Sequence, residues 1–494
     1  MKYKYIGIFS SLFIVLAALL VFLLMQPNHE RYHQHLAAQP KTPDPQHAGD
    51  GVFSTHLPLL EIDTDGVTIP GRPVYDDDHI RQGYTLAEDG STFILARLEV
   101  TDHPDTYNYE DDIPTMETLI RIHLHGYSSR YFDKPNYTVK LLAENGEEND
   151  LPLLGMSAHH DWILHGPFLD KTLLQNYMWY NIAGEIMSYA PNVRFCELML
   201  NGEYQGVYLL TERISNGKRG GRLPLSAKKD QNMFSGYLLR LDRGGSNALQ
   251  NVDSFTHYTY RAKNTINIEY PGLRNLTEKD RSAIVKDFSK FEKALYSYDF
   301  AHPTYGYPAY IDVDSFVDYF LINELSCNYD AGSLSTYIYK GLDGKFRMCV
   351  WDFNNACDRY QERSMVDPQH FEMQQKLWFE MLVRDPKFTN RLIQEYRDLR
   401  KTFFSDEYLE QYIDAVVDYL GPAIERNNER WGYSFSPAHD RLTPADRNPR
   451  SYQEAIRDTK NFLHTRTAWM DENIETLRQY CADSHTKQDK INIE

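Results

Sequence analysis

Cysteine is scarce in this chain. Five cysteines occur in 494 residues, and no two are arranged as Cys-x-x-Cys. The absence of such pairs excludes a zinc ribbon and a thioredoxin-like site, and a disulfide-stapled scaffold would need a denser set. We expect buried, apolar thiols. One disulfide stays open between Cys349 and Cys357, which flank the candidate active-site segment described below.

Positive charge is also in short supply. The chain has 52 Lys and Arg against 70 Asp and Glu, a formal net charge of −18. An acidic surface repels phosphate backbones, so we expect no nucleic-acid partner. The same balance allows a basic protein partner without requiring one.

Several catalytic signatures are missing. The sequence has no Gly-x-Ser-x-Gly elbow, no Gly-x-x-x-x-Gly-Lys-Ser/Thr loop and no Gly-x-Gly-x-x-Gly turn. These absences argue against a serine hydrolase, a P-loop NTPase and a Rossmann dinucleotide site.

One long apolar run is present, from Ile6 to Met25, behind Lys2 and Lys4. Its length suits a membrane-spanning helix, and the lysines favour a cytoplasmic N-terminus. No small-residue cleavage site follows closely, so we expect an uncleaved signal-anchor, with a cleaved signal peptide as the alternative. The soluble part would then lie outside the cytoplasm, attached to the cell membrane by a single pass.

Composition and pattern divide the chain into six parts. We expect a cytoplasmic N-terminus at 1–5, a signal-anchor at 6–25, a flexible tether at 26–56, a β-rich N-terminal lobe at 57–215, a C-terminal lobe with catalytic loop and metal-binding segment at 216–480, and a polar tail at 481–494.

Alternating apolar residues predict strands, and apolar residues recurring at about every fourth position predict helices. The expected strands are 57–62, 93–100, 118–124, 136–141, 195–200, 207–210, 336–340 and 346–350. The expected helices run from Asp170 to about Ser188, from Asp312 or Asp314 to about Leu325, and through most of 370–480. The fold class is therefore α+β, with strands first and helices last.

The order of these parts is that of a protein kinase. A strand with Lys140 is followed by a helix, two strands, a connecting region, a long helix, a polar loop with Asp330, a hairpin, and Asp352 within Trp-Asp-Phe-Asn. Phosphoryl transfer needs a cation on the nucleotide phosphates, an acid that holds Mg²⁺ and an acid near the acceptor hydroxyl. Lys140, Asp352 and Asp330 respectively fit these roles. A hydrolase using pairs among Asp330, Asp352 and Asp358 is a weaker alternative, because no flanking motif supports it.

Several segments resemble the spore-coat protein H (CotH) kinase family over about residues 57–480. They are Leu154-Gly155, Asp161–Leu164, Asp170–Leu173, Leu198–Glu212, Asp312–Leu325, Tyr329-Asp330, Val350–Phe353, Asp385–Phe388 and Arg426–Trp431. The resemblance implies a two-lobed atypical kinase that uses ATP with Mg²⁺ or Mn²⁺. Its substrate would be serine on a secreted or surface protein, for which a basic, serine-rich partner is one candidate.

The resemblance also assigns roles to residues. Asp330 matches the catalytic base and Asp352 the metal ligand. Asn354 or Asn355, which the resemblance does not assign, can add a ligand through the amide oxygen. Gly126, Ser128, Ser129 and Arg130 match a glycine-serine segment that approaches phosphates. Lys140 is the best match for the phosphate lysine, with Lys134 as its competitor, and Glu212 would lie at the link between the lobes near the nucleotide.

Two positions depart from the family pattern. Ser335 stands where an asparagine is common, and Asn354 stands where a second acid is common. Both changes weaken metal binding, so the alternative to an active kinase is a catalytically inactive surface protein that uses the fold for binding or coat assembly.

Overall fold

The computed structural model describes residues 31–47, 49, 51–217, 222–225, 236–243, 247–252, 254, 264–341, 343–361 and 367–481. The chain divides into two compact units, Met1–Tyr32 and His33–Glu494. The predicted signal-anchor at 6–25 lies outside the described residues. Within the described ranges, no helix is long and apolar enough to span a membrane.

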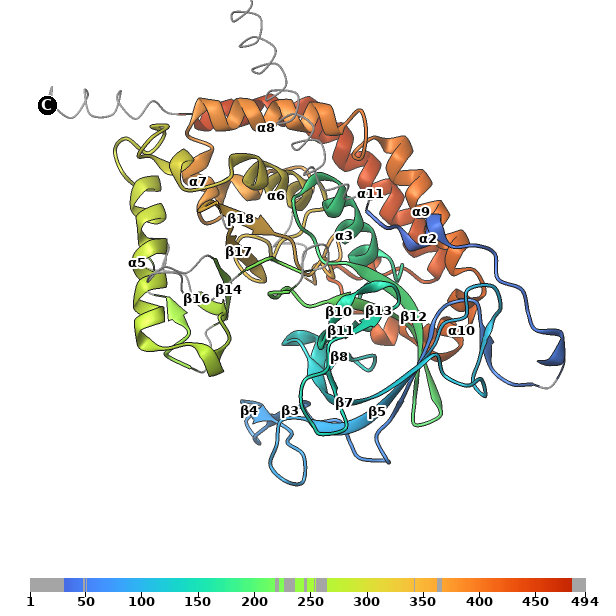
Figure 1. The fold of residues 1–494 in the computed structure, drawn as a ribbon. Helices are drawn as coiled ribbons and strands as arrows, with labels where there is room; N and C mark the ends of the chain where they lie inside the picture. Colours follow the sequence, from blue (N-terminus) through green and yellow to red (C-terminus); the bar gives the residue numbers. More distant parts are fainter. Residues whose placement is uncertain are drawn as a thin grey trace, which may run out of the picture. The chain divides into compact units, whose positions relative to one another are not determined.

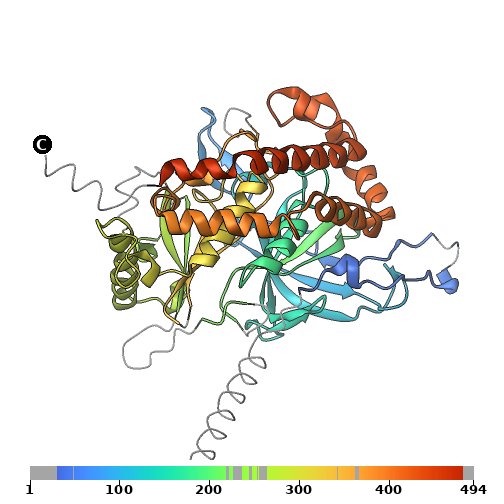
Figure 2. The same cartoon turned by 90° about the horizontal axis from the view of Figure 1, so that it is seen from above.

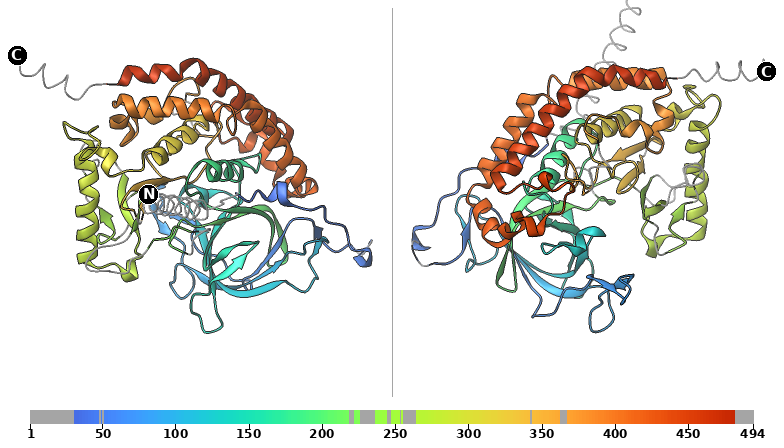
Figure 3. Two further views of the ribbon diagram at one scale, coloured as in Figure 1. Left: turned by 45° about the horizontal axis from the view of Figure 1, so that its top comes forward. Right: turned by 180° about the vertical axis from the view of Figure 1, so that it is seen from behind.

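A closed barrel forms the N-terminal part of the second unit (Figure 1). Its strands are β2 (Leu59–Asp63), β5 (Ile94–Thr101), β7 (Met116–His125), β8 (Asn136–Leu142), β11 (Asp161–His165), β12 (Val193–Leu200) and β13 (Glu203–Glu212). Around the barrel the order is β11-β13-β12-β2-β5-β7-β8, and β8 pairs with β11 to close it. Only the β12–β2 pairing is parallel among these barrel neighbours. Figure 3 (left) shows the strands curving into a ring.

Alternation of side chains explains the barrel. In β7 the side chains of Ile120, Ile122 and Leu124 are buried, while the residues between them are partly exposed. Successive strand residues point to opposite faces, so one face of each strand fills the barrel interior. The strands expected from alternation are all present, with bounds shifted by a few residues.

In the described part of the chain, three two-stranded sheets lie outside the barrel. They are β1 (Ser54–Thr55) with β6 (Asn108–Tyr109), β3 (Pro73–Tyr75) with β4 (Arg81–Tyr84), and β9 (Leu151–Leu153) with β10 (Met156–His159). The β3–β4 hairpin is tied to the turn after β7, because Arg72 Nη1 donates to the backbone oxygens of Arg130 at 2.9 Å and Phe132 at 2.7 Å.

Helix α3 (Gln175–Ile186) is inserted between β11 and β12. It was expected to begin after a cap at Asp170. Asp170 does hold the start, because its carboxylate accepts from the backbone N–H groups of Thr172 at 3.0 Å and Gln175 at 2.8 Å. The helix itself begins later, since Asp170 first closes a tight turn.

The C-terminal part combines a sheet with helices. The sheet order is β15 (Asn251–Val252), β16 (Asn264–Tyr270), β14 (Tyr237–Arg243), β17 (Thr336–Lys340) and β18 (Phe346–Cys349). The helices are α5 (Glu278–Leu295), α6 (Val313–Leu325), α7 (Phe379–Leu382), α8 (Pro386–Leu399), α9 (Asp406–Leu420), α10 (Pro422–Trp431) and α11 (Tyr452–Asn473). Seen from above, α8 and α11 lie over α6 (Figure 2).

Short 3₁₀ turns connect these elements. They are η1 (Pro45–His47), η2 (Ser128–Tyr131), η3 (Leu273–Asn275), η4 (Tyr307–Ala309), η6 (Met373–Gln375), η7 (Gly432–Phe435), η8 (Pro437–His439), η9 (Ala445–Arg447) and η10 (Ile474–Tyr480).

Helix α10 joins the helical part to the barrel. Trp431 Nε1 donates to the backbone oxygen of Gln205 at 2.8 Å, and Arg426 pairs with the fully buried carboxylate of Glu197. Gly206 permits this approach, because a Cβ there would lie 2.6 Å from Asn427 Oδ1 and its φ is +98°. The side of the barrel that carries β13 is thereby fixed against α10.

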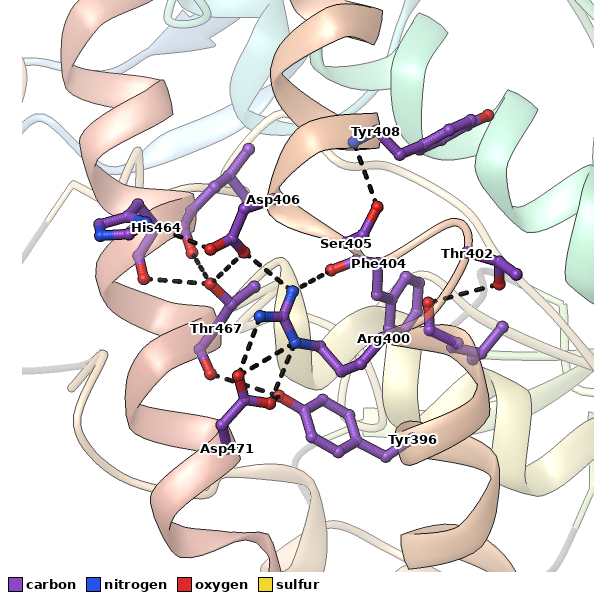
Figure 4. A network of polar contacts seen from close by, with 12 residues as sticks. Tyr396, Arg400, Thr402, Phe404, Ser405, Asp406, Tyr408, His464, Thr467 and Asp471 are labelled. Atoms are coloured by element: carbon purple, nitrogen blue, oxygen red, sulfur yellow. Dashed lines mark hydrogen bonds and ion pairs between the residues drawn. The ribbon is translucent and has the colours of Figure 1, made fainter.

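A polar network ties α8, α9 and α11 together (Figure 4). Arg400 donates to Asp471 and to Asp406, with Nη atoms at 2.9 and 2.8 Å. Asp406 also accepts from Thr467 at 2.8 Å. Burial alone would raise the pKa of Asp406, but the hydrogen bonds from Thr467 and Arg400 lower it below its usual range.

The segment expected to be a tether is partly folded. Helix α2 (Gln34–Ala37) packs against α3, α9 and β12, with His33 and Gln34 buried. Gln34 pairs with the backbone of Phe195, accepting from its N–H at 2.7 Å and donating to its oxygen at 3.1 Å. His33 bonds Glu185 at 2.8 Å and the Tyr412 hydroxyl at 3.1 Å. Composition rich in His, Pro and Gln did not reveal these specific contacts.

The cysteines are free thiols: Cys196, Cys327, Cys349, Cys357 and Cys481. The disulfide left open between Cys349 and Cys357 does not form. The first four are buried, as expected for small apolar side chains, and Cys481 is half-buried.

Candidate functional site

A cavity of about 620 Å³ lies between the barrel and the C-terminal sheet. The barrel part contributes Arg81, Tyr84, His125, Gly126, Tyr127, Ser128, Ser129, Arg130, Phe132, Asn136, Ile163, His165 and Thr211. The C-terminal part contributes Arg240, Asp242, Arg243, Asp330, Leu334, Ser335, Trp351, Asp352, Asn354 and Asn355. Leu169, Asn176 and Tyr180 complete the wall. The two acids expected to carry the chemistry therefore face one cavity.

Asp352 directly follows the β17–β18 hairpin in an unusual backbone conformation. Its φ is +59°, in the left-handed region that few non-glycine residues adopt. The backbone N–H of Asp352 donates to the Tyr180 hydroxyl at 3.0 Å, and the N–H of Phe353 donates to Asn176 Oδ1 at 2.7 Å. Helix α3 thus holds the acid in place, and strain of this kind persists where surrounding contacts maintain it.

Asp330 lies in the loop after α6. Its backbone oxygen accepts from Leu334 N–H at 2.7 Å, and its side-chain Oδ2 accepts from Asn355 Nδ2 at 2.9 Å. Lys376 supports the same loop, because its Nζ donates to the backbone oxygen of Tyr329 at 3.0 Å. These bonds link the loop that carries Asp330 to the segment that carries Asp352.

The base of this loop is held by a fully buried ion pair. Arg466 of α11 and Glu324 of α6 are 0% and 1% exposed. Glu324 also accepts from the backbone N–H of Met373 at 2.7 Å, and Arg466 donates to the backbone oxygen of His370 at 3.0 Å. The pair fixes the end of α6, only a few residues before Asp330.

The two acids have raised pKa values. Burial raises the pKa of Asp352 to about 7, and the nearby charge of Asp330 adds to the effect. Burial also raises the pKa of Asp330, against the opposing hydrogen bond from Asn355 and the charges of Arg243 and Lys376. Each of two neighbouring carboxylates disfavours the negative charge of the other. A divalent cation stabilises such a pair, because it offsets the repulsion.

The residues present therefore fit Mg²⁺ or Mn²⁺. Asp352 would hold the cation with its carboxylate, and the amide oxygen of Asn355 or Asn354 could add a ligand. Asn354 Oδ1 already accepts from Asn176 Nδ2 at 3.1 Å. A bound cation would supply charge neutralisation for transferring phosphate oxygens. Asp330, with its raised pKa, is suited to accept a proton from a hydroxyl.

The predicted glycine-serine segment also lies at the cavity. Gly126, Ser128, Ser129 and Arg130 all line it. Gly126 has a φ of +92°, and a Cβ there would lie 2.0 Å from Ser129 Oγ, which itself donates to the His125 oxygen at 3.1 Å. Only glycine fits this tight turn between β7 and β8.

Lys140 lies outside the described lining of the cavity. Its ammonium pairs with Glu148 at 2.9 Å and Asp161 at 3.1 Å. Its competitor Lys134 is buried under the barrel, where Nζ donates to the Val207 oxygen at 2.7 Å and Asn427 Oδ1 at 2.8 Å. Neither lysine is among the described residues that line the cavity.

Glu212 and Ser335 differ in their position relative to the cavity. Glu212 is fully buried. Its carboxylate accepts from the backbone N–H of Asn192 at 2.9 Å and from the side-chain amide of Asn192 at 3.0 Å. Its neighbour Thr211 lines the cavity, whereas Glu212 is outside the described lining. Ser335 does line the cavity, with a φ of +48°.

Sequence reasoning missed part of the site. Arg81, Tyr84 and Tyr127 line the cavity from a hairpin and a turn, and Asp242 and Arg243 line it from strand β14. The region of β14 was left as a connection without assigned elements. The alternating apolar residues of Tyr237–Arg243 were the signal that could have identified this strand.

Two further groups of metal-binding residue types occur in the chain. Residues 29–33 read His-Glu-Arg-Tyr-His, a zinc-ligand pattern when it lies on a helix. His29 and Glu30 lie outside the described residues, and both ring nitrogens of His33 bond protein groups. Asp150, His159 and His160 bring ligand atoms within 4.8 Å, but His159 uses both nitrogens on the backbones of Asp161 and Asn216. We assign chemistry to neither group.

Comparison with known protein families gives a match over most of the chain. The family model described as CotH kinase protein matches residues 122–470, most of the chain. The chain belongs to the CotH kinase family. The match covers the strands around Gly126, helix α3, the Asp330 loop and the Asp352 segment, so the CotH resemblance expected from the sequence is confirmed. No curated protein matches the chain.

Proposed function

We propose that this protein is a membrane-anchored, extracytoplasmic kinase that transfers the γ-phosphate of ATP to serine of a secreted or surface protein. The observation that carries the proposal is the meeting of Asp330 and Asp352 in one cavity beside the Gly126–Arg130 turn. Membership in the CotH kinase family supports kinase activity. The apolar run at 6–25 supports the anchor.

In this proposal the chain's own groups have separate tasks. Asp352 holds the divalent cation, Asp330 accepts the proton of the acceptor hydroxyl, and Asn176 with Tyr180 holds the Asp352 segment in position. Basic, serine-rich secreted proteins are suitable first acceptors, because the protein carries a net charge of −18.

The test is incubation of full-length protein with labelled ATP, Mg²⁺ or Mn²⁺, and a basic serine-rich acceptor. We expect labelled phosphoserine, and no label with Asp352→Ala. A wild-type protein that binds ATP and transfers nothing would support the inactive binding protein instead. Ser335 and Asn354 would then be the positions to restore to Asn and Asp.

The anchor has its own test. Protease added outside intact cells should digest the part that follows the tether, and the mature protein should retain Met1–Met25. A mature N-terminus near Ala38 would show a cleaved signal peptide instead.

A further inference from the structure

Three arginines and two tyrosines stack in a row along the cavity. The guanidinium of Arg130 lies 4.2 Å from the Tyr84 ring centre, and Arg81 lies 5.2 Å from the same ring. Arg81 and Arg243 each lie 4.3 Å from the Tyr127 ring centre. We call Arg130, Tyr84, Arg81, Tyr127 and Arg243 the arginine–tyrosine ladder. All five line the cavity that holds the two acids.

The ladder concentrates positive charge, and no carboxylate in the described part of the chain forms an ion pair with it. Arg81, Arg130 and Arg243 form no ion pair with any carboxylate that the structure describes. Burial lowers the pKa of Arg130, and the charge of Arg81 lowers it further. The Nε of Arg130 is buried without a hydrogen-bond partner among the described residues. In a chain of net charge −18, such a row of cations is stabilised by a bound anion.

Arg240 provides a useful contrast within the same cavity. Its Nε pairs with Glu269 at 2.8 Å, and its Nη1 lies 3.5 Å from Asp242. Carboxylates of the protein therefore neutralise Arg240. The ladder arginines lack such ion pairs within the described residues, which indicates a ligand from outside the chain.

The ladder joins elements that are far apart in the sequence. Arg81 and Tyr84 belong to the β3–β4 hairpin, Tyr127 and Arg130 to the turn after β7, and Arg243 to β14 of the C-terminal sheet. Arg243 lines the same cavity as Asp330 and Asp352. An anion held by Arg243 is therefore close to the carboxylate that would bind the cation.

We propose that the arginine–tyrosine ladder binds the polyphosphate of the nucleotide, in the role expected for Lys140. The proposal rests on the proposed function for the identity of the ligand. Guanidinium groups suit phosphates, because their fork of donors matches two oxygens at once. Tyr127 orients two of the three arginines, one from the barrel part and one from the C-terminal sheet, so phosphate binding draws on both sides of the cavity.

Binding measurements on full-length protein test this assignment. ATP, adenosine and tripolyphosphate would be titrated, with Mg²⁺, into wild type, Arg81→Gln and Arg243→Gln. Hydrogen bonds to charged groups contribute about 1.5–3 kcal/mol, so each variant should lose about tenfold or more in affinity for ATP and tripolyphosphate. Adenosine affinity should not change. The exposed Arg97→Gln is a matched charge control and should bind ATP as wild type does.

Substitutions of Tyr127 separate ligand binding from folding. Tyr127→Phe keeps the ring and should bind ATP normally, whereas Tyr127→Leu should lose affinity as the arginine variants do. Equal ATP affinity in wild type, both arginine variants and Tyr127→Leu would overturn the proposal. So would unchanged ATP affinity with a raised KM for the protein acceptor, which would assign the ladder to an acidic acceptor.

The proposal and the proposed function can fail separately. If wild type binds ATP and tripolyphosphate through the ladder but transfers no phosphate, the ladder assignment stands and the kinase proposal fails. If wild type transfers phosphate and the ladder variants transfer and bind equally well, the kinase proposal stands and the ladder assignment fails.

Discussion

The side-chain amide of Asn176 donates to Oδ1 of Asn354 at 3.1 Å and joins residues 178 positions apart in the sequence. The same amide group accepts from the backbone N–H of Phe353 through its oxygen. Helix α3 therefore acts on the Asp352 segment through both polar atoms of one side chain. This contact gives α3 a role in positioning the segment that carries Asp352, the proposed metal ligand.

Replacing Asn176 with Ala should loosen the Asp352 segment while the fold remains. Loss of an outer group that orients a metal ligand typically costs 10–100-fold in metal affinity or activity. We expect the Mg²⁺ concentration needed for half-maximal transfer to rise by that factor, measured by titrating Mg²⁺ at saturating ATP. Asn181→Ala on the same helix is a control for general damage to α3, and an equal loss in that variant would count against a specific role for Asn176.

Asp330→Asn should reduce phosphoryl transfer without weakening ATP binding. Asparagine keeps the shape of the side chain but cannot accept the acceptor's proton, and loss of a general base costs about 10²–10⁴-fold. A base that acts in the transition state affects kcat far more than affinity. Steady-state kinetics with calorimetry measures both quantities. A variant with normal kcat and reduced ATP affinity would assign Asp330 to nucleotide binding.

Arg466→Met should strongly destabilise the protein. The change leaves the carboxylate of Glu324 buried without its cation, which costs about 3–5 kcal/mol in free energy of unfolding. Urea denaturation measures this loss. The double variant Glu324→Leu with Arg466→Met should recover only part of it, because the N–H of Met373 and the oxygen of His370 would still lack partners. Full stability in the single variant would show that the pair contributes nothing.

Glu61 gives a stability effect that depends on pH. Burial, with the charges of Glu110 and Glu99, raises the pKa of Glu61 to about 7. An acid whose pKa is raised in the folded state lowers the free energy of unfolding as its carboxylate ionises. This loss grows as pH rises from the ordinary glutamate range to about 7, and it is complete above about pH 7. Below the ordinary range the acid is protonated in both states and the penalty is absent.

Glu61→Gln should therefore raise the free energy of unfolding at pH 8 and leave it unchanged at pH 4. Because the side chain is only half-buried, solvent screening limits the gain to about 1 kcal/mol. Denaturant melts at the two pH values measure it, with the exposed Glu144→Gln as a variant that should change neither. A gain of equal size at both pH values would rule out titration as its cause.

Sequence patterns predicted the barrel strands well, because each strand has one face in a continuous apolar interior. They missed helix α5, although Thr277 and Asp280 form a capping box that the sequence displays. They also missed β14 and β16, which pair with each other, and β14 pairs on its other side with β17, far along the chain. Alternation along Tyr237–Arg243 could have identified β14 as a strand, but a local pattern does not tell which distant strand it pairs with.

The site was predicted in part for a similar reason. Spacing brought Asp330 and Asp352 together, since one hairpin separates them. Alternation along β8 predicted which face of the strand carries Lys140, but it did not predict which end of the strand lies at the cavity. Asn136, on the same face, lines the cavity, while Lys140 lies at the opposite end beside Asp161. The ladder arginines come from three separate elements, and no local pattern relates them.

The left-handed backbone at Asp352 also bears on the thermal robustness of the protein. Glycine adopts that conformation without strain, so Asp352→Gly would be expected to relieve a cost on the order of 1 kcal/mol. The same substitution would remove a carboxylate from the wall of the cavity. The protein therefore carries this acid at some expense in thermal robustness.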